Sequence, residues 1–428
     1  MHTTRRNFLK LTGSAAVALG GLDAILAAKR APLFAQANPV KIGVLPIKSG
    51  VAATVGEGGM RGFQWGVDRI NAAGGILGRK IELFIEEETN PKDTTERFRK
   101  LALQNKVDMV SGGISSAVGL ALGPVAEEMK MIWVSWDATT QKGIEETMPK
   151  PKYSFRSTDN ECEAVMTSIM AAKHWKGKVK TAAGLNLDYT YGRNNWDAFQ
   201  AITKKYDMGL DYVLDLWPKI GVTDLTSHVA AIAQKKPDIV FASLVFAELP
   251  IFMKQAHAAG LTQTTKFIFP PAGLQHTAMK KAFTPDGIIF GHNSMYFEAP
   301  NASPLLKQFT KDYHEKYQDY PHFESDRAYS AIMVYKAGIE RAAKAIGGKW
   351  PTTDQIIQGM EGVEIESFGG PFKYREDHIP DCNFYAGFTT SKNRYDFSTI
   401  DPVEIMHTKN LQPPTGMGFF KWIESWKA

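Results

Sequence analysis

The sequence predicts an α/β protein made of two doubly wound lobes, each a parallel sheet covered by helices on both faces. Three observations support this prediction. A chain of 428 residues is too long for one compact core. Strand-like and helix-like segments alternate from residue 40 onward, which predicts right-handed crossovers and parallel strands. The alternation loosens at 148–157 and then begins again, as expected for two α/β units in tandem.

The segment pattern places each element of the two units. In the first unit the expected strands are 41–46, 81–87, 107–111 and 131–135, and the expected helices are 59–73, 95–105 and 117–129. In the second unit the expected helices are 163–174, 194–206, 225–234 and 250–259, and the strands are 180–186, 212–216, 239–243 and 266–269. Beyond Lys349 we expect only short strand-like pieces that pack on this body. Ligands bind at the carboxyl ends of parallel strands, so two facing lobes predict a cleft for a small molecule.

The first 37 residues have the pattern of a cleaved twin-arginine signal peptide. Residues 4–10 (TRRNFLK) carry the paired arginines, an apolar run of small residues follows at 11–28, and Ala-Gln-Ala at 35–37 suits a signal peptidase. A membrane anchor is the alternative, but a spanning helix needs about 20 strongly apolar residues. The run at 11–28 contains three glycines and an aspartate. We therefore expect cleavage near Ala37 and a periplasmic protein.

Charge and cysteine content limit the function classes. The formal charge is +5, and residues 1–37 carry +4 of it, so the remainder is near +1. Without a strong basic surplus, nucleic acid is not an expected partner. Cys162 and Cys382 are expected to be thiols rather than a disulfide, because a twin-arginine substrate folds in the reducing cytosol.

Signatures of enzymes and metal sites are absent from the sequence. The glycine run 56–62 has Arg61 where a dinucleotide fingerprint needs its third glycine, so a flexible loop that caps a helix is the favoured interpretation. The acidic run 86–88 is interpreted as a solvated strand end. No nucleophile motif occurs and no histidines have metal-ligand spacing. We expect no cofactor, no metal and no catalytic activity.

Two segments that follow neighbouring strands are candidates for binding a ligand. Ser115 and Ser116 open a helix, where backbone N–H groups and hydroxyls suit a carboxylate, although simple helix capping by Ser115 is an equal alternative. Trp136 and Asp137 follow the next strand and could contact an apolar face and a donor or cationic group. For Trp136 a core position is at least as common.

Several phrases of the chain resemble the leucine/isoleucine/valine-type periplasmic binding proteins. They are 71–81 (NAAGGILGRKI), 90–92 (NPK), 115–116, 188–193 (DYTYGR) and the strand–loop–helix at 238–261, in the family's order and spacing. The resemblance covers 40–372. It implies the type I periplasmic binding protein fold with a three-crossing hinge, and the role of extracytoplasmic receptor for the membrane permease of an ABC importer.

The resemblance also implies domain limits. The N-terminal lobe would comprise 38–157 and 295–368, and the C-terminal lobe and tail 158–294 and 369–428. Hinge rotation would occur near 157–160, 291–294 and 369–372. A monomer or weak dimer is expected.

Matching the family's motifs position by position implies a binding site. Ser116 matches the serine that holds the ligand carboxylate, Thr139 a threonine on the same lobe, and Tyr191 the tyrosine that covers the ligand from the other lobe. Asp137 matches a position that offers backbone contacts. The family's acid for the ligand ammonium falls at Pro271 or Ala272, which cannot bind a cation.

Because of this departure, the sequence does not decide between two classes of ligand. Either Asp137 takes over the amine, or the ligand is an aromatic acid or amide without one. A ligand-sensing subunit and an exported cofactor-bearing enzyme are the alternative functions.

Overall fold

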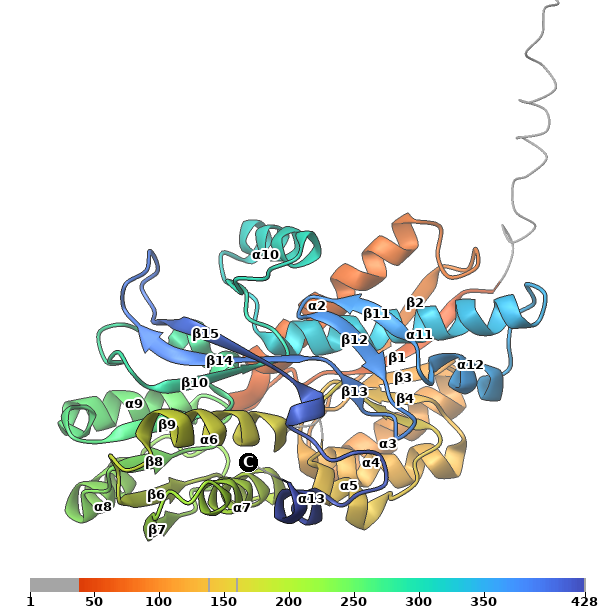
Figure 1. Cartoon of the computed structure of the whole chain (residues 1–428). Helices are drawn as coiled ribbons and strands as arrows, with labels where there is room; N and C mark the ends of the chain where they lie inside the picture. The colour runs from red at the N-terminus through yellow and green to blue at the C-terminus, as the bar shows by residue number, and fades with distance from the viewer. Residues whose placement is uncertain (1–37, 138, 159–160, 427–428) are drawn as a thin grey trace, which may run out of the picture.

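The first lobe is built on a five-stranded parallel sheet. The structure is a computed structural model that describes residues 38–137, 139–158 and 161–426 (Figure 1). The strand order is β2-β1-β3-β4-β5, with every neighbouring pair parallel. The strands are β1 (Val40–Leu45), β2 (Ile81–Ile85), β3 (Met109–Gly112), β4 (Trp133–Ser135) and β5 (Ser154–Arg156), and the helices between them are α2 (Ala53–Ala72), α3 (Pro91–Lys100), α4 (Ser116–Met129) and α5 (Gln141–Thr147). The predicted alternation is confirmed here, and it extends through α5 and β5, which the sequence pattern missed.

The second lobe contains a seven-stranded sheet in the order β15-β14-β10-β9-β8-β6-β7. Its strands are β6 (Thr181–Leu185), β7 (Asp211–Leu216), β8 (Ile239–Phe241), β9 (Lys266–Phe269), β10 (Ile289–Asn293), β14 (Asn383–Thr390) and β15 (Thr399–His407), and its helices are α6 (Glu161–Trp175), α7 (Thr190–Lys205), α8 (Thr226–Lys235) and α9 (Glu248–Ala258). β6 to β10 are parallel, whereas β14 pairs antiparallel with both β10 and β15. The expectation of only short strand-like pieces beyond Lys349 is therefore wrong, because β14 and β15 are eight and nine residues long.

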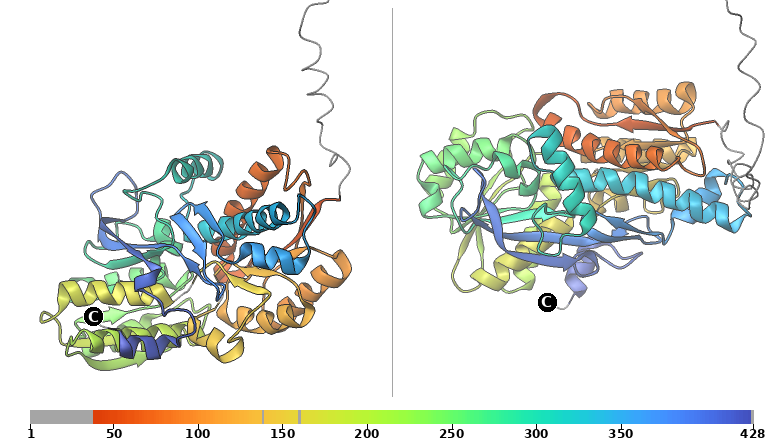
Figure 2. Two further views of the ribbon diagram at one scale, coloured as in Figure 1. Left: turned by 45° about the vertical axis from the view of Figure 1, so that its right-hand side comes forward. Right: turned by 90° about the horizontal axis from the view of Figure 1, so that it is seen from above.

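The chain passes three times between the two sheets. It leaves the first sheet after β5, returns after β10, and joins the second sheet again at β14. The elements between the second and third passages are α10 (Pro304–Tyr317), α11 (Phe323–Ala345), α12 (Thr353–Met360) and a small sheet of β11 (Glu364–Ser367), β12 (Gly370–Tyr374) and β13 (Pro380–Asp381). The chain closes with α13 (Phe419–Ser425). Figures 1 and 2 show α11 alongside α2 in the first lobe and α13 at the junction with the second.

Glycines allow α2 and α11 to approach closely. A Cβ on Gly62 would lie 2.2 Å from the backbone oxygen of Ser325, and one on Gly56 would lie 1.9 Å from that of Ile47. A Cβ on Gly59 would lie 2.7 Å from the Trp136 ring and 3.2 Å from Cγ of Glu324. The glycine run 56–62 is thus part of a buried helix face and not the flexible loop expected from the sequence. Its small residues bring the start of α11 toward the ends of β3 and β4.

The remaining structural expectations concern cysteines, metals and membrane spans. Cys162 and Cys382 are buried thiols and form no disulfide, as expected. Across 38–426, apart from the three undescribed positions, no group of His, Cys, Asp or Glu could hold a metal ion. The same residues include no helix long and apolar enough to cross a membrane. The predicted signal peptide lies outside the described residues.

Candidate functional site

The N-terminus of α4, the predicted carboxylate site, is occupied by a side chain of the protein itself. Glu88, just beyond β2, accepts hydrogen bonds from the backbone N–H groups of Ile114 at 2.7 Å and Ser115 at 2.8 Å. The side chain of Ser115 does not cap the helix, and that of Ser116 is buried. Two of the amides that were expected to bind a ligand carboxylate are therefore already satisfied by Glu88.

Glu88 is fully enclosed, in contrast to the solvated strand end expected for the acidic run 86–88. Only 1% of its surface is exposed. Burial raises the pKa of Glu88 to about 8, although the hydrogen bonds from Ser115 and Ile114 oppose this shift and the charge of Asp137 adds to it. The structure therefore places a carboxyl group with a strongly perturbed pKa at the start of α4.

Trp136 lies in the core of the first lobe. Its indole N–H donates to Oγ of Ser111 at 2.9 Å, and its ring packs on Phe63 with centroids 5.7 Å apart. None of its surface is exposed. The structure thus matches the core alternative for Trp136, which positions the neighbouring Asp137.

Asp137 meets a buried arginine that the sequence analysis did not identify. Nη1 of Arg327, near the start of α11, lies 2.5 Å from Oδ1 of Asp137 and 3.6 Å from Oε2 of Glu324. The side chains of Arg327 and Glu324 are 1% and 0% exposed. The guanidinium also lies over the ring of Phe323, 4.4 Å from its centroid. A charged triad of Asp137, Glu324 and Arg327 therefore lies beside the ends of the first-lobe strands.

Several polar atoms of this region have no hydrogen-bond partner among the described residues. They include Nε of Arg327 and Oγ1 of Thr139. Thr139 is fully buried and has a φ of +98°, a conformation that β-branched residues avoid. Unpartnered buried polar groups and strained backbone both concentrate at functional sites.

The second lobe contributes Tyr191 and an adjoining carboxyl group. The Tyr191 hydroxyl donates to Oε1 of Glu163, and Nδ2 of Asn293 donates to Oε2 at 3.0 Å. Burial raises the pKa of Glu163 to about 7, the charge of Asp137 adds to this, and Arg327 opposes it. Burial and the nearby Glu163 raise the pKa of Tyr191 well above its usual value. Charges of the two lobes therefore act on each other directly.

The lobes contact each other along the edge of this site. Nδ2 of Asn194 in α7 donates to Oγ1 of Thr140, before α5, at 2.7 Å. Nearby, Nζ of Lys142 lies 3.8 Å from Oδ2 of Asp197. Both contacts join elements of different sheets, so the two lobes touch along this edge.

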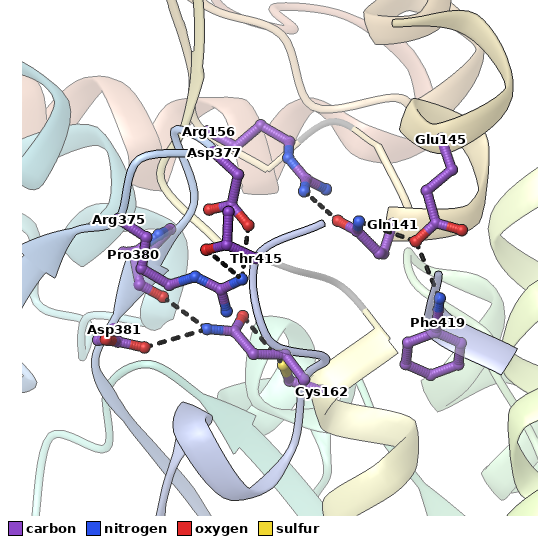
Figure 3. Close-up of polar contacts among 11 residues, drawn as sticks. Gln141, Glu145, Arg156, Cys162, Arg375, Asp377, Pro380, Asp381, Thr415 and Phe419 are labelled. Carbon is purple, nitrogen blue, oxygen red and sulfur yellow. Dashed lines mark hydrogen bonds and ion pairs between the residues drawn. The ribbon is translucent and has the colours of Figure 1, made fainter. Parts of the chain in front are cut away.

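The C-terminal helix adds a contact across the same junction (Figure 3). The backbone N–H of Phe419 donates to Oε1 of Glu145 in α5 at 2.9 Å. The same Glu145 oxygen accepts from Nε2 of Gln141 at 2.9 Å, and Oε1 of Gln141 accepts from Nη2 of Arg156 at 2.5 Å. Because α13 also packs against α7, it bridges an element of each lobe.

The sequence analysis missed four ionisable residues of the site: Glu88, Glu163, Glu324 and Arg327. A signal was present for Arg327, which precedes Ala331 by four positions and Tyr335 by eight on α11. This spacing places the arginine in line with two fully buried residues. A charged residue within an apolar helix stripe indicates a buried charge that needs a partner.

A family model and several curated proteins match most of this chain. A family model described as periplasmic binding protein matches residues 39–392. Leu/Ile/Val-binding protein homolog 7 of Brucella melitensis is 23% identical over 374 residues, which cover 83% of this chain and 90% of that protein. Leu/Ile/Val-binding protein homolog 8 of Brucella abortus is 27% identical over 338 residues, covering 76% and 81%.

Solved structures share the fold. A solute-binding protein of an ABC transporter from R. palustris, in complex with benzoate, superposes with a TM-score of 0.74 at 24% identity and covers 86% of this chain and 97% of its own. The branched-chain amino acid transporter substrate-binding protein LivJ of Streptococcus pneumoniae, in complex with isoleucine, gives 0.70 at 20% identity, covering 86% and 99%.

Proposed function

Because the chain belongs to the periplasmic binding protein family, we propose that it captures a small polar solute between its lobes and delivers it to an ABC importer. The family and the fold are those of transporter substrate-binding proteins and not of enzymes. The family is extracytoplasmic, and the two-lobed type I fold expected from the resemblance is confirmed. The membrane permease is the partner that this role requires.

One observation supports the proposal: polar groups of both lobes are buried close to one another at the junction. Asp137 and Arg327 come from the first lobe, and Glu163 and Tyr191 from the second. Charges of Arg327 and Asp137 contribute to the pKa of Glu163 across the junction. A ligand placed there would touch both lobes only in the closed form, so its binding energy would favour closure.

The candidate ligands are amino acids and related small carboxylates or amides. We propose that Ser116 and Thr139 hold the polar end of the ligand and that Tyr191 covers it from the second lobe. Ser116 is the first residue of α4 and is buried, and the unpartnered hydroxyl of Thr139 is suited to a ligand. The ligands in the complexes of two similar proteins, benzoate and isoleucine, fall within this range.

The route of export is part of the proposal. The paired arginines at 5–6 and the small residues at 35–37 support passage through the twin-arginine pathway with cleavage near Ala37. The proposed domain limits and hinge segments follow the three passages of the chain between its sheets.

Ligand-induced closure tests the proposal. Mature protein is unfolded and refolded to remove carried-over solute and is then screened by thermal shift against amino acids, aromatic acids, short amides and urea. Saturation at 100 times Kd should add about 2.7 kcal/mol of stability. Ser116→Ala should weaken binding about tenfold or more, since a buried hydrogen bond to a charged group is worth about 1.5–3 kcal/mol. Ser391→Ala, on an exposed turn, is the control, and equal affinity of both variants would refute the assignment of Ser116.

A further inference from the structure

A groove lies between α10 and the turn that joins β14 to β15, and we call it the α10 groove. Its volume is about 510 Å³, which is within the range of small-molecule sites, about 300–1,000 Å³. Its lining comes from the segment before α10, from α10 and the loop after it, and from the β14–β15 turn. Figures 1 and 2 show α10 between α2 and this turn. Elements far apart in the chain therefore enclose the groove.

The α10 groove is separate from the candidate binding site. β14 pairs antiparallel with β10, and Phe388 lies opposite Ile289, the first residue of β10. The turn after β14 is therefore at the amino end of β10, whereas parallel sheets bind ligands at the carboxyl ends of their strands. None of Ser116, Thr139 and Tyr191 lines the groove. A ligand in the groove would thus be bound independently of the solute between the lobes.

The lining of the α10 groove has an excess of positive charge. It contains three basic side chains, Lys307, Lys311 and Arg394, and one carboxylate, Glu298, which pairs with Arg394 at 3.1 Å. The two lysines are exposed and are four positions apart on α10, a spacing at which like charges repel. Lys311 also approaches Glu315 to 3.8 Å, but both side chains are largely exposed, and such a pair contributes little. An anion near both lysines would relieve their repulsion.

Aromatic rings form another part of the lining. Tyr320, in the loop after α10, stacks on His314 with ring centroids 4.5 Å apart. It also contacts the rings of Tyr395 and Phe297, at centroid distances of 4.9 and 5.0 Å. Because these rings pack against one another, they are held in place without a ligand. The groove thus combines preformed aromatic surface with a few charged groups, as small-molecule sites do.

We propose that the α10 groove is a second ligand site, for a small anion that carries an aromatic ring, such as an aromatic carboxylate or sulfonate. The ring packs against Tyr320 and Tyr395, and the charged group lies near Lys307 and Lys311. A neutral aromatic molecule would use the rings alone, and an inorganic anion would use the lysines alone. This site goes beyond the proposed function and does not depend on it.

Three probes separate the contributions of ring and charge by isothermal titration calorimetry. 2-Naphthalenesulfonate carries both, 2-naphthalenesulfonamide carries the ring without the charge, and methanesulfonate carries the charge without the ring. We expect 2-naphthalenesulfonate to bind about tenfold or more tightly than either of the others, with an affinity that falls as salt is added. Equal affinity for one of the other two probes, or no binding of 2-naphthalenesulfonate at millimolar concentration, would overturn the proposal.

Variants show where the probe binds. The double variant Lys307→Ala/Lys311→Ala should fold, because it places a strong helix former at exposed positions of α10. It should lose about tenfold or more in affinity for 2-naphthalenesulfonate. Lys92→Ala removes an exposed lysine from α3 and should bind the probe as the unaltered protein does.

The same probe distinguishes the groove from the space between the lobes. If 2-naphthalenesulfonate binds between the lobes, Ser116→Ala weakens its binding and the lysine double variant does not. That result would overturn the second site and leave the proposed function standing. Weaker binding in the double variant with unchanged binding in Ser116→Ala is the result expected for the α10 groove.

Discussion

Replacing Glu88 by Gln should remove a defined part of the pH dependence of stability. With a pKa of about 8 in the folded protein and about 4.5 unfolded, Glu88 binds a proton more tightly when folded. The stabilisation that this proton gives the folded state is complete below pH 4.5 and is lost as the pH rises through 8. Between pH 6 and pH 9 the free energy of unfolding should therefore fall by about 2.7 kcal/mol through this residue alone, at 1.36 kcal/mol per pKa unit.

The corresponding change in melting temperature is measurable by calorimetry. With about 2.1 cal/mol/K of unfolding entropy per residue, a mature chain of roughly 390 residues converts 2.7 kcal/mol into about 3 °C. The unaltered, ligand-free protein should lose this amount from Glu88 between pH 6 and pH 9 and a further part from Glu163, whose pKa is about 7. Glu88→Gln should lose only the part from Glu163.

A neighbouring acid supplies the control for this experiment. Glu87 lies one residue earlier and is only partly buried, so Glu87→Gln should keep the pH profile of the unaltered protein. The buried His322, whose pKa burial lowers to about 4, affects both variants equally and cancels from the difference. Superposable profiles of Glu88→Gln and the unaltered protein would show that Glu88 holds no extra proton, and the account of the α4 N-terminus would be wrong.

Three further predictions concern packing and closure. Asn194→Ala removes the hydrogen bond to Thr140 that joins the lobes and should weaken ligand binding about fivefold, since such a bond is worth about 1 kcal/mol; unchanged affinity would show that the contact does not favour closure. Ending the chain at Gly418 removes α13 and should increase the radius of gyration of ligand-free protein in small-angle X-ray scattering. Trp136→Ala should cost about 3–5 kcal/mol in denaturant unfolding, because the buried ring and its hydrogen bond to Ser111 are lost; a loss below 1 kcal/mol would contradict a core role.

The sequence predicted the part of the fold that depends on local patterns. Alternating strand and helix segments up to residue 269 lie where periodicity placed them, because each buries a face against its neighbours in the chain. The antiparallel partners β14 and β15 were missed. β14 pairs with β10, about 100 residues earlier in the chain. The hydrophobic period of a short segment does not indicate which distant strand it will pair with.

The site was predicted less completely, for a related reason. The sequence located Asp137 and Tyr191, which the structure brings close to the same charges. Glu324 and Arg327 arrive from α11, far along the chain, because glycines of α2 let the two helices approach. Glu163 opens a helix after the first passage between lobes, where an acidic residue is also an ordinary helix start. Their function depends on contacts between distant segments.

Glu88 and Glu324 together decide the charge at the ends of the first-lobe strands. A free helix N-terminus attracts anions through its backbone amides, but Glu88 accepts hydrogen bonds from two amides at the start of α4 and adds a carboxyl group of its own. At the start of α11, Glu324 adds another, 3.6 Å from Arg327. Burial raises the pKa of Glu88 to about 8 and that of Glu324 well above its usual value, so both groups favour the neutral form at pH 7. The charges of Asp137 and Arg327 then offset each other, so raising the pH through 8 should add negative charge to this region and weaken the binding of an anionic solute.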